Sequence, residues 1–311
     1  MSFVLKLNSK SSFRAVLFLF LMGFVFSKLN INVFIDSMKN VNKKFLILAI
    51  MYFFIYPWFG IERWRRLVLK NYSLKYNIAS KIYFLGEGIN LILPSKIGDL
   101  SKSYFLKKYK ICPTPFANGT VVYEKLLDLL SILIIFLVSW ILNEQVLYVS
   151  RWLVMLLVLV FLIGIFAMFN LHFLEKKFSK AFPYKYNFIT KPLFDFFNYF
   201  KMIKTDYVSI IFLLGFSLFF WVGHFFQVYL FIRASNIDIG FFQVTYFMPL
   251  IIILSLLPFT IAGFGPRELS LLFFLSEVST NENIILSSLL ISLRYLIPGT
   301  VGLFVYLFFE K

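Results

Sequence analysis

The chain has 311 residues, of which 60% are hydrophobic and 15% charged, and its mean hydropathy is +0.83. A water-soluble domain of this length needs a polar surface that such a composition does not supply, so the composition excludes an ordinary soluble protein. The formal net charge is +16, and the basic residues lie in short connections between apolar runs. This distribution is typical of membrane proteins, and no basic face with interleaved aromatic residues points to nucleic acid. We therefore predict an all-α polytopic membrane protein that binds no nucleic acid.

Eight apolar segments follow one another along the chain, at about 15–35, 45–60, 82–94, 117–142, 152–171, 207–232, 241–262 and 284–309. Six of them suit full transmembrane helices, for which roughly 20 residues are needed. The other two are broken, one at Pro94 and Gly98 and the other at Pro258, Gly263 and Gly265. Backbone groups freed by proline and glycine at membrane depth need protein or water as partners, which favours re-entrant segments. The sequence thus predicts about six full transmembrane helices plus two re-entrant segments, in a single transmembrane domain covering residues 1–311.

The connections differ sharply in their content of lysine and arginine. Residues 61–81 hold six, 96–110 hold five and 172–205 hold seven, whereas 143–151, 233–240 and 266–283 hold one each. If both broken segments are re-entrant, every strongly basic connection except 27–44 lies in the cytoplasm, as the positive-inside rule requires. This pattern predicts a multi-pass protein of the cell membrane with both termini cytoplasmic. We interpret 172–205, which mixes basic and aromatic residues, as an interfacial connection on the anionic leaflet.

The two broken segments echo each other. Aligning Pro94 with Pro258, 164 positions later, also brings Ile97 onto Ile261. With three crossings in each half, the halves 1–142 and 152–311 would form an inverted repeat, whose broken helices often present a polar site at the middle of the membrane. A chance match in so apolar a chain is the alternative, and the residues leave both open.

Cysteine and histidine are too few to suggest a redox or metal centre. Cys112 is the only cysteine, and His172 and His224 are far apart in sequence. We expect no metal and no cofactor, and the lack of a phosphate-binding loop motif argues against direct use of ATP. His224 lies in an apolar helix, where a hydrogen bond to a neighbouring helix is the simpler interpretation and a proton relay the alternative.

Four ordered blocks of residues resemble the transmembrane region of lysylphosphatidylglycerol synthases and the wider flippase-like family related to it. The blocks are Asn90–Pro94 with Gly98, Asp99 and Lys102; Tyr123–Asp128; Pro258 with Gly263–Glu268; and Arg294 with Pro298 and Gly302. This sequence departs from the usual family pattern in having Asp99, Lys102 and Lys125, which keep the charge but change reach and bidentate geometry. Bifunctional members of the family add a soluble aminoacyl-transferase domain, which we do not expect in this chain.

Charged residues near the breaks form the candidate site. Glu124 and Asp128 are four apart and share a helical face, with Lys125 adjacent, and ionisable groups in such a segment are costly unless paired or hydrated. A salt-bridged helix start is the alternative for this group. Arg267 suits a lipid phosphate, with Glu268 holding it when the site is empty. Arg294 calls for a buried partner, which we expect among the acidic residues. The predicted headgroup site comprises Glu87, Asn90, Asp99, Lys102, Glu124, Lys125, Asp128, Arg267, Glu268 and Arg294.

These residues and the resemblance favour a flippase-like protein that binds or translocates an anionic phospholipid or a polyprenyl-linked glycolipid. One alternative is a membrane transferase acting on a lipid acceptor, with Glu124 or Asp128 as the base, although no donor-binding domain or metal motif is visible. Another is a non-catalytic partner of a separate lipid or glycan synthase. The expected partners are accordingly membrane lipids with anionic headgroups, and either further copies of the chain or such a synthase.

Overall fold

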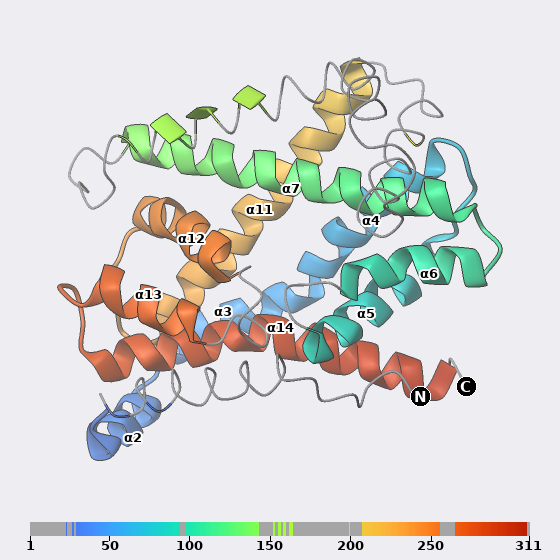
Figure 1. Cartoon of the computed structure of the whole chain (residues 1–311). Coiled ribbons are helices and arrows are strands. Elements are labelled where there is room, and N and C mark those ends of the chain that lie inside the picture. The colour runs from blue at the N-terminus through green and yellow to red at the C-terminus, as the bar shows by residue number, and fades with distance from the viewer. Residues whose placement is uncertain are drawn as a thin grey trace, which may run out of the picture.

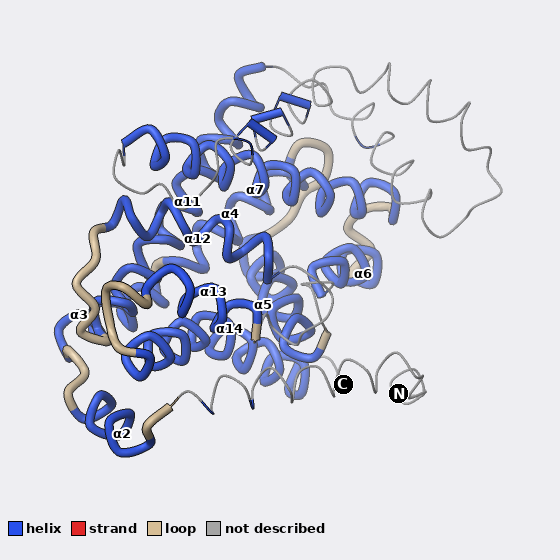
Figure 2. The backbone as a smooth tube through the Cα atoms, turned by 60° about the vertical axis from the view of Figure 1, so that its left-hand side comes forward, coloured by secondary structure: helices blue, strands red, loops and turns tan. Residues whose placement is uncertain are grey.

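The computed structural model describes residues 29–93, 98–142, 207–255 and 265–309, together with the isolated positions 23, 27, 152, 155, 156, 158, 159, 162, 163 and 199. Every regular element in these residues is a helix (Figure 1), and no strand occurs among them (Figure 2). In chain order the helices are α2 (Ile31–Lys39), α3 (Lys43–Met51), η1 (Tyr52–Phe54), α4 (Tyr56–Leu69), α5 (Tyr76–Ile92), α6 (Ser101–Lys108), α7 (Thr114–Leu142), α11 (Tyr207–Ala234), α12 (Phe241–Ser255), α13 (Pro266–Leu275) and α14 (Asn281–Phe309).

Within the described residues, four helical stretches are long and apolar enough to cross a membrane: 43–69, 114–142, 208–234 and 281–309. The first of these joins α3, η1 and α4. Together with the shorter apolar helix α12, they confirm the predicted class of all-helical polytopic membrane protein. The predicted segments 15–35 and 152–171 fall largely outside the described residues, so the expected number of six full spans stays a prediction.

Two predicted boundaries are wrong. The first apolar segment was expected to run to residue 35, but Asn30 begins a separate helix there, because its side-chain oxygen accepts from the backbone nitrogens of Asn32 and Val33. Likewise, the predicted connection 61–81 starts too early. Helix α4 continues to Leu69, since Gly60, Ile61, Trp64, Leu67 and Val68 repeat at helical spacing and are all buried.

In the described residues, each of the two broken segments includes a longer helix followed by a shorter one. Helix α5 ends at Ile92 and α6 begins at Ser101, while α12 ends at Ser255 and α13 begins at Pro266. The predicted break residues Pro94, Pro258 and Gly263 lie outside the described residues. Gly98 and Gly265 are described, and Gly265 has a φ of 97°, a left-handed conformation that glycine adopts without strain. Pro266 then occupies the first turn of α13, where its missing N–H costs nothing.

The broken segments pack against the two long helices α7 and α14 in a reciprocal way. Helix α5 contacts α14 while α6 contacts α7, and conversely α12 contacts α7 while α13 contacts α14. In Figure 1, α7 (green) and α14 (red) are the long helices above and below, and α11 crosses behind α7 and descends toward α14. Two repeat halves related by a two-fold axis would produce this exchange of partners, and the repeat itself stays a prediction.

The crossing of α5 and α14 depends on small residues. A Cβ atom on Gly302 would lie 1.8 Å from the backbone oxygen of Phe84, and one on Gly88 would lie 2.8 Å from the carbonyl carbon of Gly302. The two backbones therefore touch directly, as at other close crossings of membrane helices. This contact holds the first broken segment against the last helix and so fixes one wall of the site.

Candidate functional site

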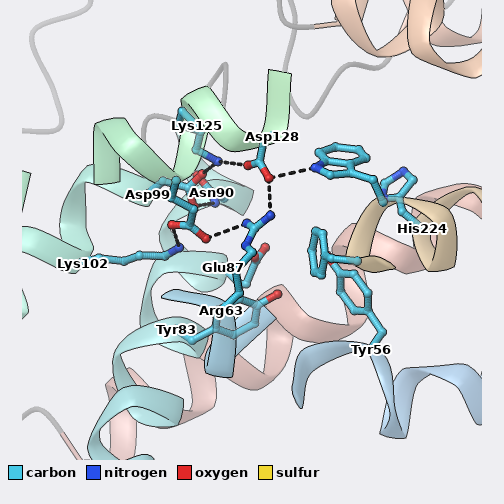
Figure 3. Close-up of a pocket in the computed structure, with 13 residues that line it drawn as sticks. Tyr56, Arg63, Tyr83, Glu87, Asn90, Asp99, Lys102, Lys125, Asp128 and His224 are labelled. Atoms are coloured by element: carbon cyan, nitrogen blue, oxygen red, sulfur yellow. Dashed lines mark hydrogen bonds and ion pairs between the residues drawn. The ribbon is translucent and has the colours of Figure 1, made fainter. Parts of the chain in front are cut away.

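A polar pocket opens among α4, α5, α6, α7 and α11 (Figure 3). It holds about 420 Å³ of empty space, counting the part that is open to its surroundings. Side chains from all five helices or their ends line it: Tyr56, Arg63, Tyr83, Glu87, Asn90, Asp99, Lys102, Glu124, Lys125, Asp128, Phe220, Trp221 and His224. Seven of these thirteen belong to the ten residues predicted from the sequence, so folding brings most of that set together.

Arg63 is the central side chain of the pocket. It is 2% exposed and lies on the buried face of α4, beside Ile61 and Trp64. Its Nη2 donates to Glu124 Oε1 over 2.9 Å, and its Nη1 donates to Asp128 Oδ1 over 2.5 Å. One guanidinium thus pairs with both carboxylates of the α7 face. The same Nη1 also donates to Ser217 Oγ on α11, over 2.9 Å, which ties three helices to one cation.

Lys102 binds the second oxygen of Glu124. Its Nζ lies 2.8 Å from Glu124 Oε2, and both side chains are buried. The ammonium also lies 5.4 Å from the centre of the Trp64 ring and 5.5 Å from that of Tyr83, within the range of cation–π attraction. Trp64 is fully buried and forms part of the cage around Lys102.

Asp128 and Asp99 complete the ion-pair network around Lys125. Lys125 Nζ pairs with Asp99 Oδ2 and lies 3.6 Å from Asp128 Oδ2. Asp128 Oδ1 additionally accepts from the indole Nε1 of Trp221 over 2.8 Å, and Asn90 Nδ2 donates to Asp99 Oδ1 over 3.0 Å. Asp99 directly follows the first break, at Gly98, so the network joins the end of the broken segment to α7.

The charges in the pocket nearly balance. Arg63, Lys102 and Lys125 contribute three positive charges, and the four lining carboxylates are Glu87, Asp99, Glu124 and Asp128. With every group ionised, one negative charge is in excess. Burying so many charges is costly unless they are paired and hydrogen-bonded, and this network supplies the pairing. An incoming charged group could exchange with these internal partners, so the pocket suits a ligand that both accepts and donates strong hydrogen bonds.

Arg294 lies beside the pocket, and its partners differ from those expected. We predicted a buried carboxylate, but Nε donates to His224 Nδ1 over 2.8 Å and Nη1 donates to Gln227 Oε1. The guanidinium carbon also lies 3.8 Å from the centre of the Tyr56 ring. Because Tyr56 and His224 line the pocket, Arg294 forms the layer behind it. For His224, the sequence left open a hydrogen bond to a neighbouring helix or a proton relay. The hydrogen bond from Arg294 on α14 agrees with the first, simpler interpretation.

Arg267 and Glu268 form a separate buried cluster at the second break. Arg267 Nη2 donates to Glu268 Oε1 over 2.7 Å and to Ser292 Oγ over 2.6 Å. Ser288 Oγ donates to the same Glu268 oxygen over 2.6 Å. The other oxygen, Glu268 Oε2, accepts from the backbone nitrogen of Gly265, which caps the start of α13. These two predicted site residues therefore contact α14 and are not among the residues that line the pocket.

Sequence reasoning missed Arg63, and with it Ser217 and Trp221. Arg63 was counted among the basic residues of a cytoplasmic connection. The signal that could have identified it is the apolar repeat that continues through Trp64, Leu67 and Val68, which places Arg63 on a buried face. Ser217 and Trp221 offer no such signal, because an apolar helix with a serine and a tryptophan is common in any membrane protein.

Comparison with known proteins agrees with these observations. A search among curated proteins found no match. A family model described as the lysylphosphatidylglycerol synthase TM region matches residues 11–302. This range includes all the helices described above except the last turns of α14, and every residue of the polar pocket. The chain therefore belongs to the family of the lysylphosphatidylglycerol synthase transmembrane region.

Proposed function

We propose that this membrane protein binds the headgroup of an amphipathic lipid in the polar pocket and transfers it across the membrane. The observation that carries the proposal is the paired network of Arg63, Lys102, Glu124 and Asp128, buried among apolar helices. Ionisable groups are rare inside membrane segments and generally mark a substrate or ion pathway. Membership of the family agrees with a membrane role for the chain.

The pocket chemistry narrows the class of headgroup. Arg63 and Lys102 suit a phosphate, because a guanidinium and an ammonium form charge-assisted hydrogen bonds with its oxygens. The carboxylates that they release then need donors, which hydroxyl or amine groups supply. A phosphate combined with hydroxyls or amines fits this requirement better than a phosphate alone. Phosphatidylglycerol, its lysyl derivative and polyprenyl-phosphate sugars all belong to this class.

Arg267, Glu268 and Arg294 are proposed to serve the same headgroup along its path. The cluster at the second break has the same kind of partners as the pocket: a cation, a carboxylate and hydroxyls at buried positions. Arg294 lies two residues after Ser292 on α14, while its own side chain contacts Tyr56 and His224 of the pocket wall. Polar groups therefore continue from the pocket to the second break.

The test is headgroup-labelled lipid translocation in proteoliposomes. Phosphatidylglycerol, lysylphosphatidylglycerol and a polyprenyl-phosphate sugar are compared for the natural chain, Glu124→Gln and Arg267→Ala. We expect one lipid class to move and both substitutions to abolish the movement in protein that still elutes as a folded species. Phe304→Leu, at an exposed position of α14, is the control and should move lipid normally. If no lipid moves under an ion gradient or a membrane potential, the transport proposal is wrong.

A further inference from the structure

A second concave surface lies between the last turns of α4 and the first turns of α11. It is an open groove of about 800 Å³, counting the space that is open to its surroundings. Three basic side chains, Arg65, Arg66 and Lys70, form one part of its lining. Apolar side chains, including Leu69 and Phe212, form another. The groove shares no lining residue with the polar pocket described above.

The charged side chains among the described lining residues of the groove are mainly basic. Glu62 is the single carboxylate among its described lining residues, and it pairs with both Arg65 Nη1 over 3.0 Å and Arg66 Nε over 2.9 Å. Among the described lining residues, three cations therefore stand against one carboxylate. The Arg66 side chain is 40% exposed, so its guanidinium can reach a ligand without leaving Glu62. An anion is therefore the complementary ligand.

The apolar part of the lining indicates that this anion belongs to a lipid. Phe212 is 48% exposed and Leu69 is 40% exposed, although both are large hydrophobic residues. They lie at the ends of the two candidate spans 43–69 and 208–234, the depth at which headgroups meet acyl chains. The six basic residues of 61–81 place this end of the spans on the side predicted to be cytoplasmic, where anionic lipids attract basic groups.

A row of arginine–phenylalanine contacts connects the groove to the polar pocket. The guanidinium carbon of Arg66 lies 5.0 Å from the ring centre of Phe212 and 5.1 Å from that of Phe216. One turn earlier on α4, Arg63 lies 4.6 Å from the ring centre of Phe220. The three phenylalanines are spaced by four on α11, so they share a face. Arg66 in the groove and Arg63 in the pocket therefore lie against the same face of α11, one turn apart on α4.

We propose that the groove binds the phosphate headgroup of an anionic phospholipid from the adjacent leaflet. Arg66 and Lys70 bind the phosphate, and Phe212 and Leu69 contact the glycerol and the first acyl carbons. The site is separate from the polar pocket, and lipid binding in it does not depend on transport.

Native mass spectrometry of the purified chain, titrated with phosphatidylglycerol or phosphatidylcholine in an uncharged detergent, tests the site. We expect the first phosphatidylglycerol to bind at least tenfold more tightly than phosphatidylcholine. Arg66→Gln/Lys70→Gln should weaken that binding at least tenfold. The matched control is Lys43→Gln/Lys44→Gln, which removes two exposed positive charges from the other end of the same span. This control should change the affinity for phosphatidylglycerol less than twofold. Lys70→Gln alone keeps the Glu62–Arg66 pair and should still weaken binding, and its elution as a folded species is checked alongside.

Three results would overturn the proposal. The first is equal phosphatidylglycerol affinity in the groove variant and the lysine control, and the second is equal affinity of the natural chain for the two lipids. The third is displacement of the lipid by inorganic phosphate at the same concentration, which would show an anion site that does not recognise lipid. Glu124→Gln separates this proposal from transport: it should leave the first lipid bound with unchanged affinity. If Glu124→Gln lowers the affinity for the first phosphatidylglycerol and the groove variant does not, the first phosphatidylglycerol binds in the polar pocket and not in the groove.

Discussion

Arg63 and Asp128, 65 residues apart in the chain, are joined by a hydrogen-bonded ion pair of 2.5 Å between Nη1 and Oδ1. The pair crosses from α4 to α7 inside the polar pocket, and the second nitrogen of the same guanidinium holds Glu124. Because these three residues come from two helices and are buried, the pair fixes both the shape and the charge of the pocket.

Replacing Arg63 should destabilise the protein strongly. Arg63→Ala leaves two buried carboxylates without their main partner, and breaking such a pair from one side costs about 3–5 kcal/mol. Arg63→Lys keeps the charge but offers a single point cation, so it should cost less while still losing one of the two carboxylates. Thermal unfolding in detergent measures both variants. Equal stability of Arg63→Ala and the natural chain would show that the network is not a structural element.

Lys102 should tolerate arginine but not glutamine. An arginine keeps a positive charge near Glu124 Oε2 and can also lie against Trp64, whereas glutamine leaves that oxygen without a cation. We expect Lys102→Arg to retain most of the translocation activity and Lys102→Gln to lose at least tenfold. The comparison is made in proteoliposomes with equal amounts of folded protein. Full activity of Lys102→Gln would exclude a role for this cation in headgroup binding.

Gly302→Ala should separate α5 from α14. The added Cβ would lie 1.8 Å from the backbone oxygen of Phe84, which cannot move without shifting the whole helix. Gly215→Ala in α11 is the matched control, since nothing lies within 4 Å of its added Cβ. Alanine there should leave the melting temperature unchanged or raise it slightly, because alanine favours helix. If the two variants melt together, α5 and α14 do not touch as described.

Cys112 should be almost unreactive toward thiol reagents. Burial raises the pKa of its thiol to about 12. The reactive form is the thiolate, whose fraction at pH 8 is then only about 10⁻⁴. Labelling by a maleimide should therefore be slow at pH 8 and should become fast when the chain is unfolded in detergent at the same pH. Rapid labelling of the folded protein at pH 8 would contradict a buried thiol.

Much of the site was predictable from the sequence because local patterns specify faces. Glu124, Lys125 and Asp128 lie within two turns of one helix, so their proximity follows from helical geometry alone. Gly98 and Asp99 mark the end of the first broken segment, and folding places Asp99 beside Lys125 as part of the same network. The corresponding prediction for Arg267 and Glu268 located a polar cluster but assigned it to the same site as the others, since sequence spacing does not reveal which helix faces which.

The sequence by itself determined that the chain lies in a membrane and that it is helical, because composition and the length of the apolar segments decide these properties locally. Only the tertiary structure decided which charges meet. Arg63 pairs with Glu124 and Asp128 across 61 and 65 positions, and with Ser217 across 154. Such pairs depend on how α4 packs against α7 and α11, and helical periodicity defines the buried face of each helix without defining the helix that covers it.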